Sequence, residues 1–391
     1  MKNNLLTFLL FIAISGCSFS RAQDFATSTP HPPPPSPSLT ITPLTISTIT
    51  SSHEPSLTST FPPYTGKPFS IVFTRNKNLW IANIGEKVTE KQLTFEPHEM
   101  RIIDFDVSPD GTRIIYIPYQ LDPLNSLIKL VDISTGDTSV ILGENDPFSE
   151  VKVVWIDNTT IAYKNQRTYT KDNEIITFIV YDLSMNKQLG ITDFITMHPS
   201  PNPRFWLGCS RWGAEGECGE YTLQNIVDSE QYKLEGEMEL GGFIGWSPDS
   251  RSMLFNTVTW PPVCTSQLIM VDAETLEQRS ITTEDENVWE ASFSPTGNFL
   301  FYEQLEMGLC QSGEVDYRVL NLDNQQTYEI PVDFQKDVWG FDWTPDGKHL
   351  LFFHDSHSSY ENELWSMSLT GSDLQPILAN VEEFKVLDSI P

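Results

Sequence analysis

The chain has 391 residues, and its 53 Asp and Glu against 24 Lys and Arg give a formal net charge of −29 at pH 7. Residues 1–66 carry no net charge, so the whole acidic excess belongs to residues 67–391. Such a surface repels phosphate backbones and anionic lipid. We therefore expect no nucleic-acid partner.

The chain begins with an export signal. Lys2 precedes an apolar run at 5–14, which is too short to span a membrane as a helix. The sequence ISGC at 14–17 resembles the lipobox of bacterial lipoproteins. The resemblance implies that residues 1–16 are a lipoprotein signal peptide and that Cys17 carries lipid, anchoring the protein to the outer face of a bacterial cell membrane or in the cell envelope. The alternative is an ordinary secretory signal with an incidental cysteine.

Residues 17–66 are rich in Ser, Thr and Pro and lack apolar clusters. Such a composition cannot bury a core, which predicts a disordered, extended linker. We expect a single folded domain at 67–391, and we expect it to be a monomer.

The folded part is built from repeats. Six apolar runs each end in a turn, usually Ser/Thr-Pro, and a second apolar run follows at once. These turns are anchored at Ser108, Ile156, Ser200, Ser247, Ser294 and Thr344. The steps of 48, 44, 47, 47 and 50 residues are typical of one four-stranded antiparallel blade of a β-propeller. The third strands are expected to end at Asp132, Asp182, Asp228, Asp272 and Asp323.

The two ends of the repeat region predict how the ring closes. The first repeat opens on its second strand, at 71–75, and lacks an inner strand. The last residues repeat the inner-strand pattern, and Ser389 lies 45 residues after Thr344. We therefore predict an all-β, seven-bladed propeller in which this C-terminal strand completes the first blade. Six or eight blades, or a frayed tail, are the alternatives.

The repeat motif resembles that of TolB-type, WD-repeat-like propellers. The matching pattern is Ser-Pro-Asp-Gly at 108–111, then an apolar strand, then a strand that ends at Asp132. The likeness covers about residues 67–391 and departs from the pattern at 156–158 and at Asn202. It implies a ligand-binding or protein-interaction scaffold of the cell envelope. Some relatives are fused to peptidases, but we expect no peptidase activity here, because no hydrolase domain accompanies the repeats.

Four cysteines besides Cys17 suit an exported protein. Cys209 and Cys218 flank one hairpin loop, so we expect them to pair locally. Cys264 and Cys310 occupy matching loops of neighbouring repeats and could link two blades.

The longer loops share one face of the predicted ring, which makes this face the candidate ligand surface. The candidate ligand-binding residues there are Arg101, Trp260, Trp289, Glu290, Trp339 and Glu383. Aromatic rings beside charges suit a sugar or a peptide. Alternatively, these tryptophans pack between blades.

Catalytic motifs are missing from the sequence: it has no G-x-S-x-G, no H-E-x-x-H and no phosphate loop. His98, His354 and His357 are weak candidates for a metal site, and we expect neither a metal nor another cofactor. The sequence favours a non-enzymatic, envelope-anchored module that binds protein, peptide or glycan. The alternative is a metal-assisted polysaccharide lyase or hydrolase with its site in the central pocket.

Overall fold

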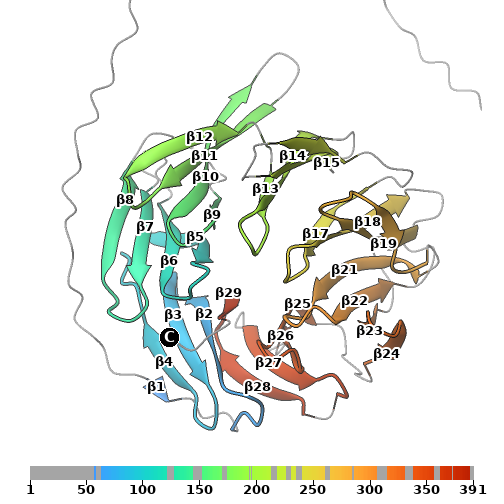
Figure 1. The fold of residues 1–391 in the computed structure, drawn as a ribbon. Coiled ribbons are helices and arrows are strands. Elements are labelled where there is room, and N and C mark those ends of the chain that lie inside the picture. Colours follow the sequence, from blue (N-terminus) through green and yellow to red (C-terminus); the bar gives the residue numbers. More distant parts are fainter. Residues whose placement is uncertain are drawn as a thin grey trace, which may run out of the picture. The chain divides into compact units, whose positions relative to one another are not determined.

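The computed structural model describes residues 57–58, 63–120, 127–143, 152–169, 174–192, 194, 196–212, 218–225, 230–234, 240–259, 265–283, 286–305, 315–330, 338–355, 362–371 and 373–387. All of them belong to one compact unit, Ile46–Pro391. They form seven antiparallel sheets that follow one another around a ring (Figure 1). The described residues contain no helix that could cross a membrane. The predicted all-β, seven-bladed propeller is confirmed.

Each sheet is one blade. The first contains β1 (Leu57–Thr58), β2 (Phe69–Arg75), β3 (Asn78–Ile84), β4 (Thr89–Gln92) and β29 (Glu383–Leu387). The second contains β5 (Met100–Val107), β6 (Arg113–Gln120), β7 (Leu127–Asp132) and β8 (Thr138–Gly143). The third contains β9 (Val153–Trp155), β10 (Thr160–Tyr169), β11 (Glu174–Asp182) and β12 (Lys187–Thr192). The fourth contains β13 (Thr196–Pro199), β14 (Phe205–Trp212), β15 (Cys218–Asn225) and β16 (Gln231–Lys233).

The last three blades have the same order, with the inner strand first. The fifth contains β17 (Phe243–Trp246), β18 (Ser252–Thr259), β19 (Thr265–Asp272) and β20 (Gln278–Ser280). The sixth contains β21 (Val288–Phe293), β22 (Phe299–Leu305), β23 (Val315–Asn321) and β24 (Gln326–Glu329). The seventh contains β25 (Val338–Trp343), β26 (His349–Asp355), β27 (Asn362–Ser368) and β28 (Gln375–Ala379).

The Ser/Thr-Pro turns join the first two strands of a blade, as predicted. In the second blade the Ser108 hydroxyl donates to the Asp110 carboxylate at 2.6 Å and accepts from the Arg113 amide at 3.0 Å. Thr344 makes the equivalent pair of bonds in the seventh blade. These bonds satisfy the turn locally, which explains why the motif recurs.

The third strands depart from the prediction in two blades. In the sixth, β23 ends at Asn321, whose side-chain oxygen accepts the amide hydrogen of Asp323 at 2.9 Å. An asparagine here serves as well as an aspartate, because either side chain can accept that bond. In the fourth blade β15 ends at Asn225, and Asp228 lies outside the described residues.

The C-terminal strand closes the ring, as predicted. β29 pairs antiparallel with β2, from Ser70 opposite Leu387 to Thr74 opposite Glu383. Figure 1 shows the red strand β29 beside the blue strand β2. Leu387 is buried in a cluster with Phe105 of the second blade. Both ends of the repeat region are therefore joined in one sheet.

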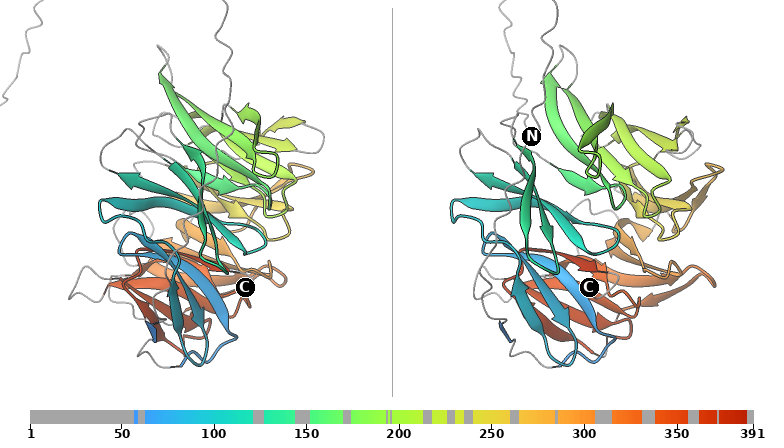
Figure 2. Two further views of the ribbon diagram at one scale, coloured as in Figure 1. Left: turned by 90° about the vertical axis from the view of Figure 1, so that its left-hand side faces the viewer. Right: turned by 60° about the vertical axis from the view of Figure 1, so that its left-hand side comes forward.

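Tryptophans tie the blades together in pairs. The indole of Trp155 donates to the backbone oxygen of Asp106 in the preceding blade at 3.1 Å. Trp246 binds the oxygen of His198 at 3.1 Å, and Trp343 binds that of Ser292 at 3.3 Å. The faces of successive sheets are turned toward each other around the ring (Figure 2). These bonds link the second blade to the third, the fourth to the fifth and the sixth to the seventh.

Packing begins N-terminal to the predicted domain boundary at residue 67. β1 adds a fifth strand to the first blade by pairing with β4. The Tyr64 side chain is buried, and its hydroxyl lies 3.2 Å from Nδ1 of His349 in the seventh blade. A side chain at Gly66 would collide with the Tyr64 ring, so this fold-back requires glycine. The last part of the Ser/Thr/Pro-rich segment thus belongs to the ring.

Candidate functional site

Four of the predicted ligand-binding residues lie near the starts of inner strands. Arg101 is in β5, Glu290 in β21, Trp339 in β25 and Glu383 in β29, and all four are exposed. Because inner strands run alongside the axis of the ring, their starts share one end of it. We call these four residues the channel mouth.

Trp339 is the aromatic residue of the channel mouth. Its side chain is 40% exposed, and it stacks on Phe353 with ring centroids 5.8 Å apart. Phe353 in turn contacts Phe384 of β29 edge-to-face at 5.2 Å. We call Trp339, Phe353 and Phe384 the aromatic platform. Phe353 and Phe384 hold the indole of Trp339 in place. A ligand that stacks on this indole therefore does not have to order it first, which lowers the entropy cost of binding.

A β-bulge aims Trp339 at Phe353. The register between β25 and β26 shifts between Trp339 and Asp342. Gly340, inside this bulge, has a φ of +68°, and an added Cβ would lie 2.9 Å from the Phe353 ring. Only glycine fits both the backbone angle and the space. Gly340 is therefore a positioning residue for the platform.

Charged residues of the first two blades pack together below the channel mouth. The Lys385 ammonium lies 2.6 Å from the Asp106 carboxylate, and the Val153 amide donates to Asp104 at 2.7 Å. Burial raises the pKa of Asp104 and of Glu383. Burial opposes the charge of Lys385, but the carboxylates of Asp106, Asp104 and Glu383 outweigh it and raise its pKa. One ammonium thus faces three carboxylates, and the Lys385–Asp106 ion pair and the Val153–Asp104 hydrogen bond link three inner strands.

Arg101 is the cation of the channel mouth, and the remaining candidates, Trp260 and the Trp289 side chain, lie outside the described residues. The Arg101 guanidinium lies 6.0 Å from the centre of the Tyr119 ring, a cation–π contact in the second blade. Trp289 belongs to β21, but its side chain, like the whole of Trp260, lies outside the described residues.

The structure describes two of the three candidate histidines, His98 and His354. His98 is almost fully exposed and lies 2.9 Å from Glu99. His354 packs against Trp365, with ring centroids 5.1 Å apart. His357 lies outside the described residues, and those that are described contain no group of three or more His, Cys, Asp or Glu able to hold a metal ion.

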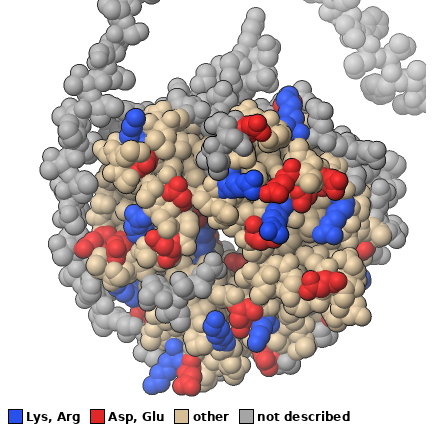
Figure 3. All heavy atoms as spheres, in the orientation of Figure 1, with Lys and Arg blue, Asp and Glu red and all other residues tan. Residues whose placement is uncertain are grey.

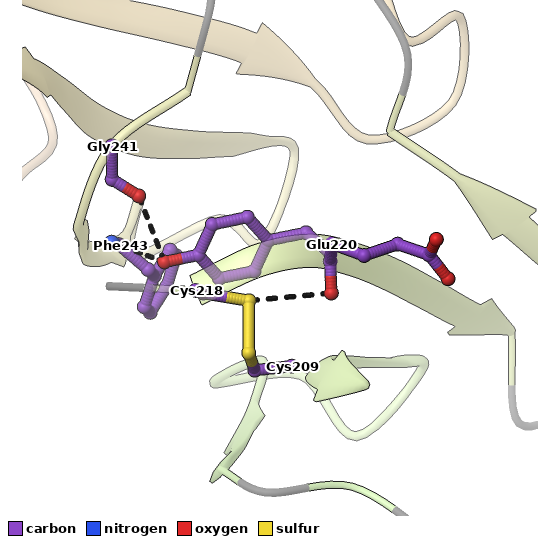
Figure 4. The surroundings of a disulfide bond; sticks show 6 residues. Cys209, Cys218, Glu220, Gly241 and Phe243 are labelled. Carbon is purple, nitrogen blue, oxygen red and sulfur yellow. Dashed lines mark hydrogen bonds between the residues drawn. A yellow bond between two sulfur atoms is a disulfide. The ribbon is translucent and has the colours of Figure 1, made fainter. Parts of the chain in front are cut away.

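Cys209 and Cys218 form the predicted local disulfide, with their Cα atoms 5.7 Å apart (Figure 4). Both side chains are buried. The neighbouring Tyr221 hydroxyl donates to the Gly241 oxygen at 3.0 Å and accepts from the Phe243 amide at 2.9 Å, which holds the crossover into the fifth blade. A disulfide indicates an oxidising compartment. Cys264 and Cys310 lie outside the described residues.

Charges of both signs are mixed over the face of the ring that Figure 3 shows, and this face is hollowed at its centre. The described residues drawn on this face form no continuous basic patch.

No family model and no curated protein matches the chain. Among solved structures it is similar to an oligogalacturonate lyase in complex with manganese, with 15% identity, a TM-score of 0.58 and coverage of 84% of this chain and 98% of that one. It is also similar to a prolyl endopeptidase, with 12% identity, a TM-score of 0.53 and coverage of 81% and 50%. TolB from Acinetobacter baumannii matches at 11% identity and a TM-score of 0.44, over 81% and 80%.

The lyase and the prolyl endopeptidase are both enzymes, and both match this chain at low identity. They show that the propeller fold is shared, and one propeller fold hosts many unrelated functions. The function of this chain must therefore be argued from its own residues.

The sequence predicts Trp339 and Glu383 as candidates but not the residues that lie beside them. Phe353 reads as an ordinary core residue of a second strand, and Phe384 as part of the closing tail. Glu303, two positions further along its strand than Phe301, also gave no signal. Pairing within a blade places Phe353 opposite Trp339, and a contact between blades places Phe384 against Phe353. The spacing of the repeats encodes neither the register of these strands nor the contact between blades.

Proposed function

We propose that this protein is an exported, lipid-anchored binding module that engages a protein, peptide or glycan partner at its channel mouth. Lipid on Cys17 would provide the anchor, and the residues before β1 would provide the tether. The ring itself would act without catalysis.

The observation that carries this proposal is the aromatic platform. An exposed tryptophan backed by two packed rings leaves apolar surface in contact with water, which is unfavourable unless a ligand covers it. Rigid aromatic anchors contribute much of the binding energy at recognition sites. Glu290 and Glu383 at the same end of the ring add hydrogen-bond acceptors. A flat ring face beside carboxylates suits a neutral sugar or a peptide that carries basic side chains.

A metal-assisted enzyme acting on polysaccharide is the second candidate. It is favoured by the fold shared with an oligogalacturonate lyase in complex with manganese. The chain's formal charge of −29 and the carboxylates of Glu290 and Glu383 at the mouth weigh against it, because they would repel a polyanionic substrate. A neutral polysaccharide would not meet this repulsion.

The test is a binding screen of the lipid-free chain, residues 18–391, against immobilised glycans and peptides. Trp339→Ala should abolish binding of the ligand that is found. Tyr328→Ala should retain it, because Tyr328 is exposed on the outer strand β24, far along its sheet from the inner strands. A ligand bound equally by the wild type and Trp339→Ala would contradict the proposal, as would a chain that binds no probe. Cleavage products in the screen would favour the enzyme.

A further inference from the structure

Two glutamates meet in the sixth blade beside the channel mouth. Glu303 of β22 lies opposite Tyr317 of β23, and Glu290 lies in β21 within a bulge between Val288 and Ala291. Residues opposite each other on adjacent strands share a face of the sheet, so Glu303 and Tyr317 point the same way. Val288 lies opposite Gln304 and Ala291 opposite Tyr302, so the bulge places Glu290 opposite Glu303. At this position the charge of Glu290 acts on Glu303 and on Tyr317.

This face of the sixth blade packs against the seventh. The Tyr317 and Phe301 rings lie 4.9 Å and 4.6 Å from the ring of Phe341, which belongs to β25. The same strand carries Trp339 of the aromatic platform. The glutamates therefore lie next to the aromatic contact that packs β25 against the sixth blade.

Among the described residues, no cation pairs with either glutamate. The groups that face Glu303 are Glu290 from β21 and Tyr317 from β23, and the described contacts from the seventh blade are aromatic. Arg318 on β23 is directed to Asp316, 3.8 Å away. Two carboxylates that are close together without a counter-ion repel each other when both are ionised.

We propose that Glu290 and Glu303 form a proton switch, which tightens the contact between the sixth and seventh blades when one proton is held and loosens it when both carboxyls are ionised. This inference does not depend on the proposed function.

The direction of the effect follows from the titration of Glu303. Burial, followed by the charge of Glu290, raises its pKa from an ordinary 4.5 to about 7. A carboxyl whose pKa is raised by folding stabilises the fold fully below its unfolded-state pKa, and this contribution is lost as pH rises through the folded-state pKa. The contact is thus tightest below pH 4.5, weakens between 4.5 and about 7 and stays weak above that.

The test compares unfolding of the wild type, Glu303→Gln, Glu290→Gln and a control, Glu329→Gln, from pH 4.5 to 8. Glu329 is exposed on the outer strand β24. Relative to the wild type, Glu303→Gln should lower the unfolding equilibrium constant about 10- to 100-fold more at pH 8 than at pH 4.5, because the glutamine stays neutral. Glu290→Gln should give a smaller change of the same sign, and the control should give none.

Hydrogen exchange locates the effect. Corrected for intrinsic rates, amides of 299–305 and 338–343 in the wild type should exchange faster at pH 8 than at pH 5.5, and this difference should vanish in Glu303→Gln. Stability curves that stay parallel in the wild type and both glutamate variants would overturn the proposal. Should Glu303→Gln fail to fold, Glu290→Gln decides alone, because Glu290 is exposed and its replacement leaves the core intact.

Discussion

Deleting residues 383–391 should destabilise the whole ring, although the deletion touches only one strand. The deletion removes β29, which supplies five residue pairs to the ladder with β2. It also leaves β2 as an exposed edge whose side chains are all buried in the intact ring. An open, apolar edge is a site of aggregation.

The magnitude follows from three side chains. Leu387 is 2% exposed, while Phe384 and Val386 pack partly buried against the cluster formed by the first and seventh blades. Fully burying a residue of this kind contributes about 1.5–3 kcal/mol, so Leu387 with about half that value for each of the two partly buried residues contributes about 3–6 kcal/mol. The salt bridge between Lys385 and Asp106 is lost as well. The free energy of unfolding of a domain is only about 5–15 kcal/mol, so the deletion removes a large part of it.

The assay is denaturant and thermal unfolding of the lipid-free chain, followed by circular dichroism. The truncated ring should melt at least about 5 °C lower than the intact one or fail to fold. The matched control deletes residues 18–45, which lie outside the compact unit that holds the ring, and should leave the melting temperature unchanged. A tail deletion as stable as the intact chain would refute the closure by β29.

Three further predictions address the anchor, the platform and the disulfide region. Cys17→Ala should move the protein from the membrane to the soluble fraction, and persistent membrane association would argue against lipid on this thiol. Gly340→Ala should cost about 1–2 kcal/mol through its positive φ and displace Phe353, measured by unfolding and by near-ultraviolet circular dichroism; an unchanged aromatic signal would count against the bulge as the positioning element. Tyr221→Phe should cost about 1–3 kcal/mol, because two half-buried backbone groups lose their partner, and a neutral result would show that water replaces the hydroxyl.

The architecture was predictable because each blade is a local unit. The spacing of turns such as Ser108 and Thr344 gave the blade period, and the unpaired pattern at residues 383–389 gave the closure. Both depend on hydrogen bonds and alternation within a short stretch of chain. The same holds for Cys209 and Cys218, whose separation of 9 residues across one hairpin favoured local pairing.

Contacts between blades were not predictable in this way. The folded-back Tyr64 lies in a segment whose composition predicts disorder, yet it meets His349, 285 residues away. The bulges at Gly340 and Glu290 shift the register of inner strands, and the repeat pattern does not predict them. The candidate site depends on these shifts, which is why residues of the channel mouth could be named from the sequence but their arrangement could not.

The measurement that tests the proposed binding site most directly is a hydrogen-exchange footprint of the lipid-free chain with the ligand found in the screen. Bound ligand should slow exchange at 338–343 and at 383–387, the inner strands that carry the aromatic platform, while the outer strands β16, β20 and β24 exchange as before. Protection confined to those outer strands, with β25 and β29 unchanged, would contradict the proposal that this propeller binds its partner at the channel mouth.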